Sequence, residues 1–391
     1  MLKKVISYLL VFTLSISLFI FTASAEEPEI NVKAKAAVLM DVASGKVLYA
    51  LNEHERLYPA SVTKIMAMLL FAEAIDGGRM TLSEKVTASE TAAGKGGSQI
   101  WLKEGEQMTV DELLRATAIG SANDACTALG EHLAGSEEGF VKMMNDRAKA
   151  LGMNDTHFDN CSGLDDDTQT HLTSAYDIGV MSCELLKHEF IRNYTTVWMD
   201  SLRGGETELV NTNKLVRFYK GTTGLKTGTT SKAGHCLSAS AERDGLHLAA
   251  VVLGAENSND RFEGAKALLN YGFASYERVT PDIDETLIGK VGVIRGLTKE
   301  VTPVVSGLTP VTLRMGQKDN TVTETELCEN VEAPVEKGQF LGRVIIKSGE
   351  EVLCEYPLVS ENEIRRISFA DVLARFFVSL VKNDKESNVC G

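Results

Sequence analysis

The alternation of apolar and polar residues predicts mixed helices and strands in the first part of the chain. Two short apolar runs, 36–40 and 46–49, flank a turn-like segment of small and polar residues, which predicts a β-hairpin. Pro59 precedes a run of helix-forming residues from Val62 to Glu73, so a helix is expected to begin at or beside Ser61. The hairpin would then lead into this helix and place it against a sheet.

Residues 73–190 are expected to be mainly helical, with glycines marking the turns. Thr109 and Glu112 have the spacing of a capping box, which predicts a helix from Val110 to Ala118. Further helices are expected at 125–133, from Thr173 to Leu186, and at 257–273, and strands at 224–230, 234–241 and 247–253. Helices inserted among antiparallel strands give an α+β fold, and we expect this domain at 26–277.

The composition changes after residue 277, where short β-rich runs alternate with Gly, Pro and Asn turns. Strands are expected at 292–294, 311–314 and 343–346, and residues 347–350 have the sequence of a hairpin tip. We therefore expect a small all-β domain at 278–363.

The two ends of the chain differ from both domains. Residues 1–25 carry Lys3 and Lys4, then an apolar run, then an Ala-x-Ala site at Ala23 to Ala25, which is typical of a cleaved secretory signal peptide. An uncleaved membrane anchor is the alternative for this segment.

The C-terminal segment, 364–391, contains a wide apolar face at helical spacing between Ile367 and Lys382. This helix is too short and too charged to span a bilayer, so we expect it to lie in the membrane interface. A helix docked on the all-β domain is the alternative.

The charge and the cysteines narrow the possible partners. The formal net charge is −14, and removal of residues 1–25, which carry two lysines and no acidic residue, gives −16. A nucleic acid partner is therefore not expected. The seven cysteines show no metal-ligand spacing, and the aspartates at 165–167 lack the ligand pattern of a calcium loop. No metal and no cofactor are expected.

The sequence around Ser61 suggests chemistry. Ser61 and Lys64 are three residues apart, which places both side chains on one face of a helix. A serine hydroxyl needs a neighbouring base to become a nucleophile, and a desolvated, neutral Lys64 can be that base. The helix N-terminus also directs free N–H groups at Ser61. The alternative is that Ser61 caps a core helix and Lys64 is solvated.

Two more motifs follow in a fixed order. Ser121-Ala122-Asn123 and Lys226-Thr227-Gly228 are each weak signals alone, but their order, spacing and exported context strengthen one another. The set resembles that of the low-molecular-mass penicillin-binding proteins that are D-alanyl-D-alanine carboxypeptidases, and the resemblance covers most of the chain. It implies a penicillin-binding/β-lactamase-like transpeptidase fold, with an antiparallel sheet and a helical subdomain.

The resemblance also implies the reaction. Ser61 would attack the penultimate carbonyl of a peptidoglycan stem pentapeptide ending in D-Ala-D-Ala, and Lys64 would take its proton. Ser121 would relay a proton to the departing amine, while Asn123 would bind the substrate and Lys64. Water would then hydrolyse the acyl-enzyme, and β-lactams would act as covalent inhibitors.

The Lys226 motif would bind the substrate. Positively charged Lys226 would attract the terminal carboxylate and help keep Lys64 neutral, and Thr227 would donate a hydrogen bond. Gly228, without a side chain, would let the substrate pair with the strand edge. By analogy, the backbone N–H groups of Ser61 and Thr229 would form the oxyanion hole.

Two other functions stay open. A class A β-lactamase shares all three motifs but needs a glutamate well before the lysine strand, and Glu208 lies too close to Lys226 for that role. The second open function is that of a catalytically silent peptidoglycan-binding protein. The resemblance places the protein on the outer face of the cytoplasmic membrane, held by its C-terminal helix.

Overall fold

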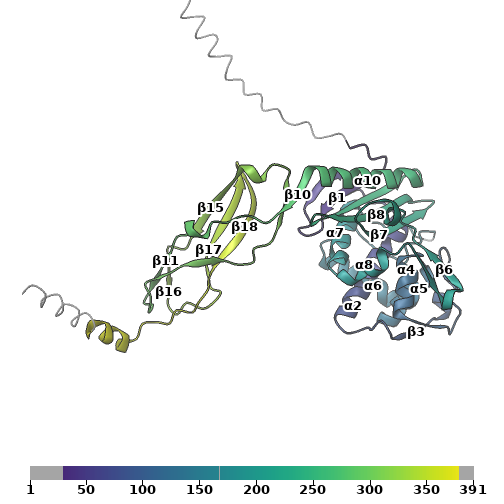
Figure 1. Cartoon of the computed structure of the whole chain (residues 1–391). Coiled ribbons are helices and arrows are strands. Elements are labelled where there is room, and N and C mark those ends of the chain that lie inside the picture. Colours follow the sequence, from purple (N-terminus) through teal and green to yellow (C-terminus); the bar gives the residue numbers. More distant parts are fainter. Residues whose placement is uncertain (1–29, 167, 378–391) are drawn as a thin grey trace, which may run out of the picture. The chain divides into compact units, whose positions relative to one another are not determined.

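The computed structural model describes residues 30–166 and 168–377, so the signal peptide expected at 1–25 lies outside the described residues. The chain divides into two units, 1–31 and 32–391, and all elements named below belong to the second. Figure 1 gives their order along the chain.

A five-stranded antiparallel sheet is the centre of the N-terminal domain. Its strand order is β2-β1-β9-β8-β7, so β7 lies at one edge and pairs with β8 alone. The bounds are β1 Ala36–Asp41, β2 Val47–Leu51, β7 Thr222–Thr230, β8 Gly234–Arg243 and β9 Leu246–Ala255. The predicted hairpin and the three later strands are confirmed.

Helices cover both faces of this sheet (Figure 1). A Cβ on Gly179 of α7 (Ala175–Leu186) would meet Met40 and Val38, whereas a Cβ on Gly272 of α10 (Ser258–Ser275) would meet Leu39 and Leu248. Because neighbouring residues of a strand point to opposite faces, these two helices pack on opposite sides of β1. The α+β fold expected from the sequence is confirmed.

The remaining helices form a subdomain next to α7. It includes α2 (Lys64–Asp76), α3 (Glu90–Ala93), α4 (Val110–Ala118), α5 (Asn123–Ala134), α6 (Glu137–Ala150), α8 (Arg192–Thr195) and α9 (Leu215–Phe218). Nearly every residue of α2 is buried, so this helix forms the centre of the main hydrophobic core. Two short strand pairs and one β-bridge lie between these helices. The pairs are β3 (Lys85–Thr87) with β4 (Gln107–Thr109) and β5 (Met199–Leu202) with β6 (Thr207–Val210), and the bridge joins Leu57 to Thr173.

The caps of these helices test the predicted boundaries. The capping box of Thr109 and Glu112 is present at the start of α4. The helix expected to start at Thr173 starts at Ala175 instead, because Ser174 is the N-cap and accepts a hydrogen bond from the backbone N–H of Asp177. Thr173 pairs with Leu57 in a β-bridge and stays outside the helix.

The C-terminal domain is built from short strands around two small hydrophobic cores. Its sheets have the orders β12-β11-β16, β13-β18-β17-β15 and β10-β14. The bounds are β10 Tyr276–Val279, β11 Val291–Ile294, β12 Glu300–Val301, β13 Pro303–Val305, β14 Val311–Arg314, β15 Thr321–Leu327, β16 Asn330–Glu332, β17 Phe340–Ser348 and β18 Glu351–Ser360. The hairpin tip expected at 347–350 joins β17 to β18 and is confirmed. Bridges from Val335 to Ile364 and from Gly296 to Arg366 extend the pairing past the boundary expected at residue 363.

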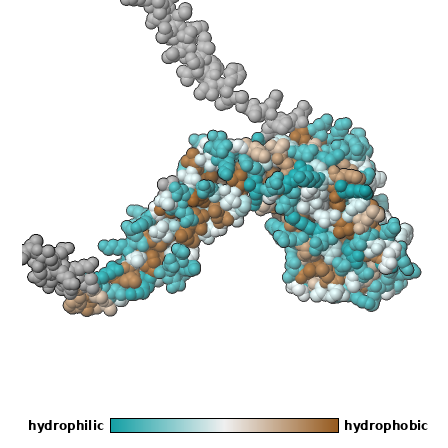
Figure 2. Space-filling model, in the orientation of Figure 1, coloured by the Kyte–Doolittle hydropathy of each residue, from teal (hydrophilic) through white to brown (hydrophobic). Residues whose placement is uncertain are grey.

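A helix over residues 369–377 follows this domain. Ser368 and Asp371 exchange hydrogen bonds at its start, and its apolar residues are exposed, with Phe369 81% exposed. Figure 2 shows these apolar residues gathered on the helix. The rest of the predicted tail helix, up to Lys382, lies outside the described residues. Among the described residues, no helix is both long enough and apolar enough to cross a membrane.

Candidate active site

Ser61 lies at the start of the helix that the sequence predicts. A 3-10 turn covers Ala60–Thr63, and the α-helix proper begins at Lys64. A Cβ on Gly163 would lie 1.8 Å from the carbonyl oxygen of Ala60, so the 163 loop packs directly on this turn. Only glycine fits there, because Gly163 also has a φ of +86°.

The Lys64 side chain is fully buried and makes three hydrogen bonds. Its Nζ lies 3.0 Å from Ser61 Oγ, 2.6 Å from Asn123 Oδ1 and 2.8 Å from the carbonyl oxygen of Ser162. Burial lowers the pKa of Lys64 from its ordinary value of 10.5 to about 8. A base of that pKa beside a serine hydroxyl can accept the serine proton near neutral pH.

Asn123 is fixed on the other side of Lys64. It is the first residue of α5, its Nδ2 donates to the carbonyl of Gly96 at 2.7 Å, and its backbone N–H donates to the carbonyl of Ser98 at 2.7 Å. The amide oxygen therefore faces Lys64. The loop from Gly96 to Ser98 thus forms one wall of the site.

Ser121 lies at the same helix start and is almost fully buried, with a φ of +62°. In the described part of the chain, no hydrogen bond joins its hydroxyl to Ser61 or to either lysine. The proton relay through Ser121 stays a prediction.

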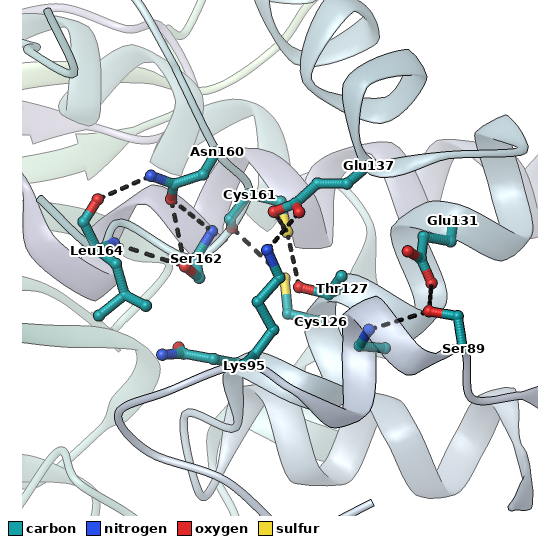
Figure 3. Close-up of polar contacts among 12 residues, drawn as sticks. Ser89, Lys95, Cys126, Thr127, Glu131, Glu137, Asn160, Cys161, Ser162 and Leu164 are labelled. Atoms are coloured by element: carbon teal, nitrogen blue, oxygen red, sulfur yellow. Dashed lines mark hydrogen bonds and ion pairs between the residues drawn. The ribbon is translucent and has the colours of Figure 1, made fainter. Parts of the chain in front are cut away.

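The loop 160–164 contributes two residues that were not assigned to the site from the sequence. The amide oxygen of Asn160 accepts hydrogen bonds from the backbone N–H groups of Ser162 at 3.1 Å and Gly163 at 2.7 Å, and its Nδ2 donates to the carbonyl of Leu164 at 2.7 Å. Figure 3 shows this side chain inside the turn that it organises. The carbonyl of Ser162 is thereby aimed at Lys64, so Asn160 and Ser162 belong to the site.

Side chains behind this loop connect it to the wall formed by Gly96. Lys95 forms an ion pair with Glu137 at the start of α6 (Figure 3). The thiol of Cys161 lies 3.6 Å from the same carboxylate and 3.4 Å from the hydroxyl of Thr127. The two walls that hold Lys64 therefore share one partly buried polar cluster.

The edge strand β7 passes in front of Ser61. A Cβ on Gly228 would lie 2.7 Å from the carbonyl oxygen of Pro59 and 3.0 Å from the backbone nitrogen of Ser61. The expectation that the missing side chain lets the substrate approach the strand stays a prediction, and the structure adds a second reason for glycine at this position. The space at Gly228 is taken by the turn that carries Ser61, which brings the backbone of Thr229 close to Ser61.

Lys226 and Thr227 precede this glycine on β7. Lys226 is fully buried, and its Nζ donates to the carbonyl of Thr227 at 3.0 Å. The Thr227 hydroxyl donates to the hydroxyl of Thr212 at 2.7 Å. Burial, then the charges of Lys64 and Arg261, lower the pKa of Lys226 well below its ordinary value. These surroundings therefore disfavour the positive form of Lys226. They do not favour the expected resting arrangement, in which Lys226 is permanently positive and Lys64 is neutral.

Arg261 is a site residue that the sequence analysis missed. It lies on α10, is largely buried, and its Nη1 donates to the carbonyl of Gly228 at 3.0 Å and to the Thr229 hydroxyl at 2.9 Å. Its Nε is buried without a partner among the described residues. Only the position of the arginine four residues after the N-cap Asn257 marks it in the sequence, and that signal is not specific.

This combination defines a class of protein. A buried lysine bonded to a serine at a helix start, next to the edge strand of an antiparallel sheet, is the machinery of serine acyl transfer. The described residues bring together Ser61, Lys64, Asn123 and the strand from Lys226 to Thr229.

Comparisons with known proteins agree with this class. Residues 21–257 match the D-alanyl-D-alanine carboxypeptidase family, and residues 276–366 match the C-terminal domain of penicillin-binding protein 5. The D-alanyl-D-alanine carboxypeptidase DacF of Bacillus subtilis is 41% identical over 95% of this chain and 97% of its own. The crystal structure of penicillin-binding protein 5 from Haemophilus influenzae has a TM-score of 0.76 at 29% identity, covering 86% of this chain and 98% of that one. Penicillin-binding protein D2 from Listeria monocytogenes, in its ampicillin-bound form, has a TM-score of 0.55 at 32% identity and covers 63% of this chain and 100% of that one.

The chain therefore belongs to the D-alanyl-D-alanine carboxypeptidase family. The predicted membership of the low-molecular-mass penicillin-binding proteins is confirmed, as are the transpeptidase-like fold and the serine peptidase class.

Proposed function

We propose that this enzyme removes the terminal D-alanine from peptidoglycan stem pentapeptides through an acyl-enzyme on Ser61. The observation that carries the proposal is the 3.0 Å hydrogen bond between Lys64 Nζ and Ser61 Oγ, formed by a lysine whose pKa is lowered to about 8 by burial. Family membership supplies the substrate class.

Acylation begins with proton transfer from Ser61 to Lys64. The serine oxygen attacks the penultimate carbonyl, and the backbone N–H groups of Ser61 and Thr229 stabilise the oxyanion. The close approach of Gly228 to the nitrogen of Ser61 supports this pair of donors. The proton then passes to the amine of the leaving D-alanine, with Ser121 as the relay, and water hydrolyses the ester.

Lys64 and Lys226 compete for one proton, and they do not hold it equally well. The ammonium form of Lys64 has three acceptors around it, whereas that of Lys226 has one, so the free enzyme holds the proton on Lys64. A substrate carboxylate next to Lys226 favours the charged form of that lysine. Substrate binding would then release Lys64 as the base.

The substrate carboxylate is bound at the end of β7. Lys226, the Thr227 hydroxyl and the buried Arg261 all lie at this strand, and together they supply positive charge and hydrogen-bond donors. The free edge of β7 offers backbone groups to the peptide itself.

The enzyme acts outside the cell, where peptidoglycan is found. Its C-terminal helix holds it on the membrane surface. The exposed apolar residues Phe369, Phe376 and Phe377 support an interfacial position. Truncation before Ile367 should free the exported protein from membranes and leave its carboxypeptidase activity intact. Retention of the truncated protein in the membrane fraction would contradict this role.

The reaction is tested with a fluorescent penicillin and a pentapeptide mimic. The protein should be labelled on the peptide that contains Ser61, and it should release D-alanine. Ser61→Ala should abolish both, whereas Ser201→Ala, which removes an exposed hydroxyl outside the site, should change neither. Labelling of the Ser61→Ala protein would mean that another residue is the nucleophile.

The same assay separates the two alternatives. Fast hydrolysis of penicillin would indicate a β-lactamase, whereas a long-lived acyl-enzyme supports the carboxypeptidase. No D-alanine release by the wild-type protein would favour a silent binding protein.

A further inference from the structure

Trp101 is an exposed aromatic residue held in an unusual backbone conformation. Its side chain is 75% exposed, and its φ is +60°, in the left-handed region that non-glycine residues avoid. The residues on both sides, Ile100 and Leu102, are buried. A single exposed apolar residue is ordinary on a protein surface, but a strained one needs a reason.

A buried carboxylate fixes the backbone on both sides of Trp101. Asp124 accepts hydrogen bonds from the backbone N–H groups of Ile100 at 3.1 Å and Leu102 at 3.0 Å, and it is fully buried. Arg203 holds the same segment from the other side, because its Nη1 donates to the carbonyl of Ile100 at 2.8 Å. The fold therefore presents the indole to solvent in one defined place.

The backbone at Trp101 continues the loop that forms one wall of the active site. Asp124 follows Asn123, which bonds Lys64, and Asn123 also donates to the carbonyl of Ser98, three residues before Trp101. The loop that forms one wall of the site thus continues directly to the indole. Among the described residues, the Trp101 indole takes no part in the hydrogen bonds around Ser61 and Lys64, so it is free to contact a part of the substrate remote from the reacting bond.

We propose that Trp101 binds the muramyl group at the N-terminal end of the stem peptide, with the indole against the apolar face of the sugar ring. This inference rests on the proposed function. An extended chain spans about 3.3–3.6 Å per residue, so the four residues before the cleaved bond place the sugar about 13 Å from the attacked carbonyl. A rim residue, and not one beside Ser61, is where such a group would arrive.

The chemistry of the indole favours a sugar over the peptide. Tryptophan offers a large, rigid apolar face with one polar N–H, and such residues give binding energy at a low entropic cost. The charged side chains of a stem peptide need charged partners, whereas a pyranose ring has an apolar face of C–H groups. The enzyme would therefore distinguish glycan-linked stem peptides from free ones.

The test compares three substrates of increasing length: a diacylated tripeptide ending in D-Ala-D-Ala, the free pentapeptide, and the muramyl pentapeptide. Trp101→Gly is the main variant, because glycine removes the indole and accepts the positive φ. We expect a loss of about tenfold in kcat/KM for the muramyl pentapeptide, the size typical of losing one aromatic anchor. The two shorter substrates and penicillin acylation should be unchanged.

Two controls separate binding from folding. Phe218→Ala removes another exposed aromatic side chain, on α9, and should not change the ranking of the three substrates. The thermal midpoint of Trp101→Gly should not fall below that of Trp101→Ala, because alanine keeps the strain.

Direct binding gives a second readout. The chain has two tryptophans, so a Ser61→Ala, Trp198→Phe protein reports on Trp101 alone by fluorescence. Muramyl pentapeptide should change this signal, and free pentapeptide at the same concentration should not.

Several results would overturn the inference. An equal loss on all three substrates would mean that Trp101 supports the loop, and an equal loss on both pentapeptides would assign it to the peptide. No loss on any substrate would remove it from recognition. Failure of the wild-type enzyme on every substrate would instead refute the proposed function, which makes the two failures distinguishable.

Discussion

Gly228 and Ser61 are in such close contact that a Cβ on the glycine would come within 3.0 Å of the serine backbone nitrogen. The contact joins the edge of the sheet to the start of the catalytic helix. It sets the separation between the two N–H groups that we assign to the oxyanion hole, and it makes the strand position part of the catalytic geometry.

Gly228→Ala should therefore damage catalysis more than folding. The added methyl group must push β7 away from the turn at Ser61, because its nearest neighbours are two backbone atoms and the Cβ of Ala60, none of which can rotate aside. Displacing one oxyanion donor costs roughly 10²–10³ in rate, so penicillin acylation should slow by about that factor. Stopped-flow acylation measures the loss, and thermal unfolding shows whether the variant is folded. Acylation at the wild-type rate would show that the strand position is not critical.

Asn160→Ala should slow acylation through the position of Lys64. Without the amide, the turn at 162–163 loses the acceptor that orients it, and the Ser162 carbonyl no longer faces Lys64. A shift of about 1 Å in a reacting group can cost about 10²-fold. Asn270→Ala is the matched control, since it removes an exposed asparagine whose side chain, among the described residues, accepts a hydrogen bond from the Tyr219 hydroxyl. If both variants acylate equally fast, the turn does not need Asn160.

These examples show what the sequence could and could not predict. The motif residues Ser61, Lys64 and Asn123 were found because three motifs, each weak alone, occur together in a fixed order and spacing. Ser162 was not found, because it acts through a backbone carbonyl that any residue possesses. Arg261 was not found for a different reason: its contact with Gly228 exists only after α10 has packed on the sheet.

In the secondary structure too, some features were predicted from the sequence and others depend on tertiary contacts. Long apolar runs predicted the strands and α2, and a local capping box predicted α4. The start of α7 was displaced because a tertiary bridge to Leu57 takes Thr173 out of the helix. The steric reason for a glycine at position 228 was not predicted, since only the fold shows which backbone approaches it.

The rate of acylation should depend on pH through Lys64. Burial lowers the pKa of this lysine to about 8, and only its neutral form can accept the serine proton. Acylation by penicillin should rise about tenfold per pH unit well below pH 8 and level off above it. A rate that stays constant from pH 6 to pH 9 would exclude Lys64 as the base.

Stability gives an independent measurement of the same pKa. The folded-state pKa of Lys64 lies below its ordinary value, so the unfolded chain binds more protons between about pH 8 and 10.5. The Lys64 contribution to stability should therefore rise with pH across that window. Lys64→Met removes the group, so the difference in unfolding free energy between wild type and variant should change in this range. A constant difference would mean that the folded-state pKa is not lowered.

Arg261 should control the affinity for the substrate carboxylate. It is largely buried beside Lys226, and its Nη1 already holds Gly228 and Thr229 in place. Arg261→Met would remove the charge and keep most of the volume, and loss of one partner from a buried hydrogen-bonded charge pair costs about 2–5 kcal/mol. We expect KM for a D-Ala-D-Ala peptide to rise by roughly 10-fold or more.

A substrate with a C-terminal amide identifies the cause of that loss. The wild-type enzyme should bind the amide poorly, and Arg261→Met should bind the amide and the free acid with similar affinity, because the group that distinguishes them is gone. Arg261→Lys keeps the charge but not the planar guanidinium, so it should recover part of the preference for the acid. A variant that keeps the full wild-type preference would show that the carboxylate is recognised by Lys226 and Thr227 without the arginine.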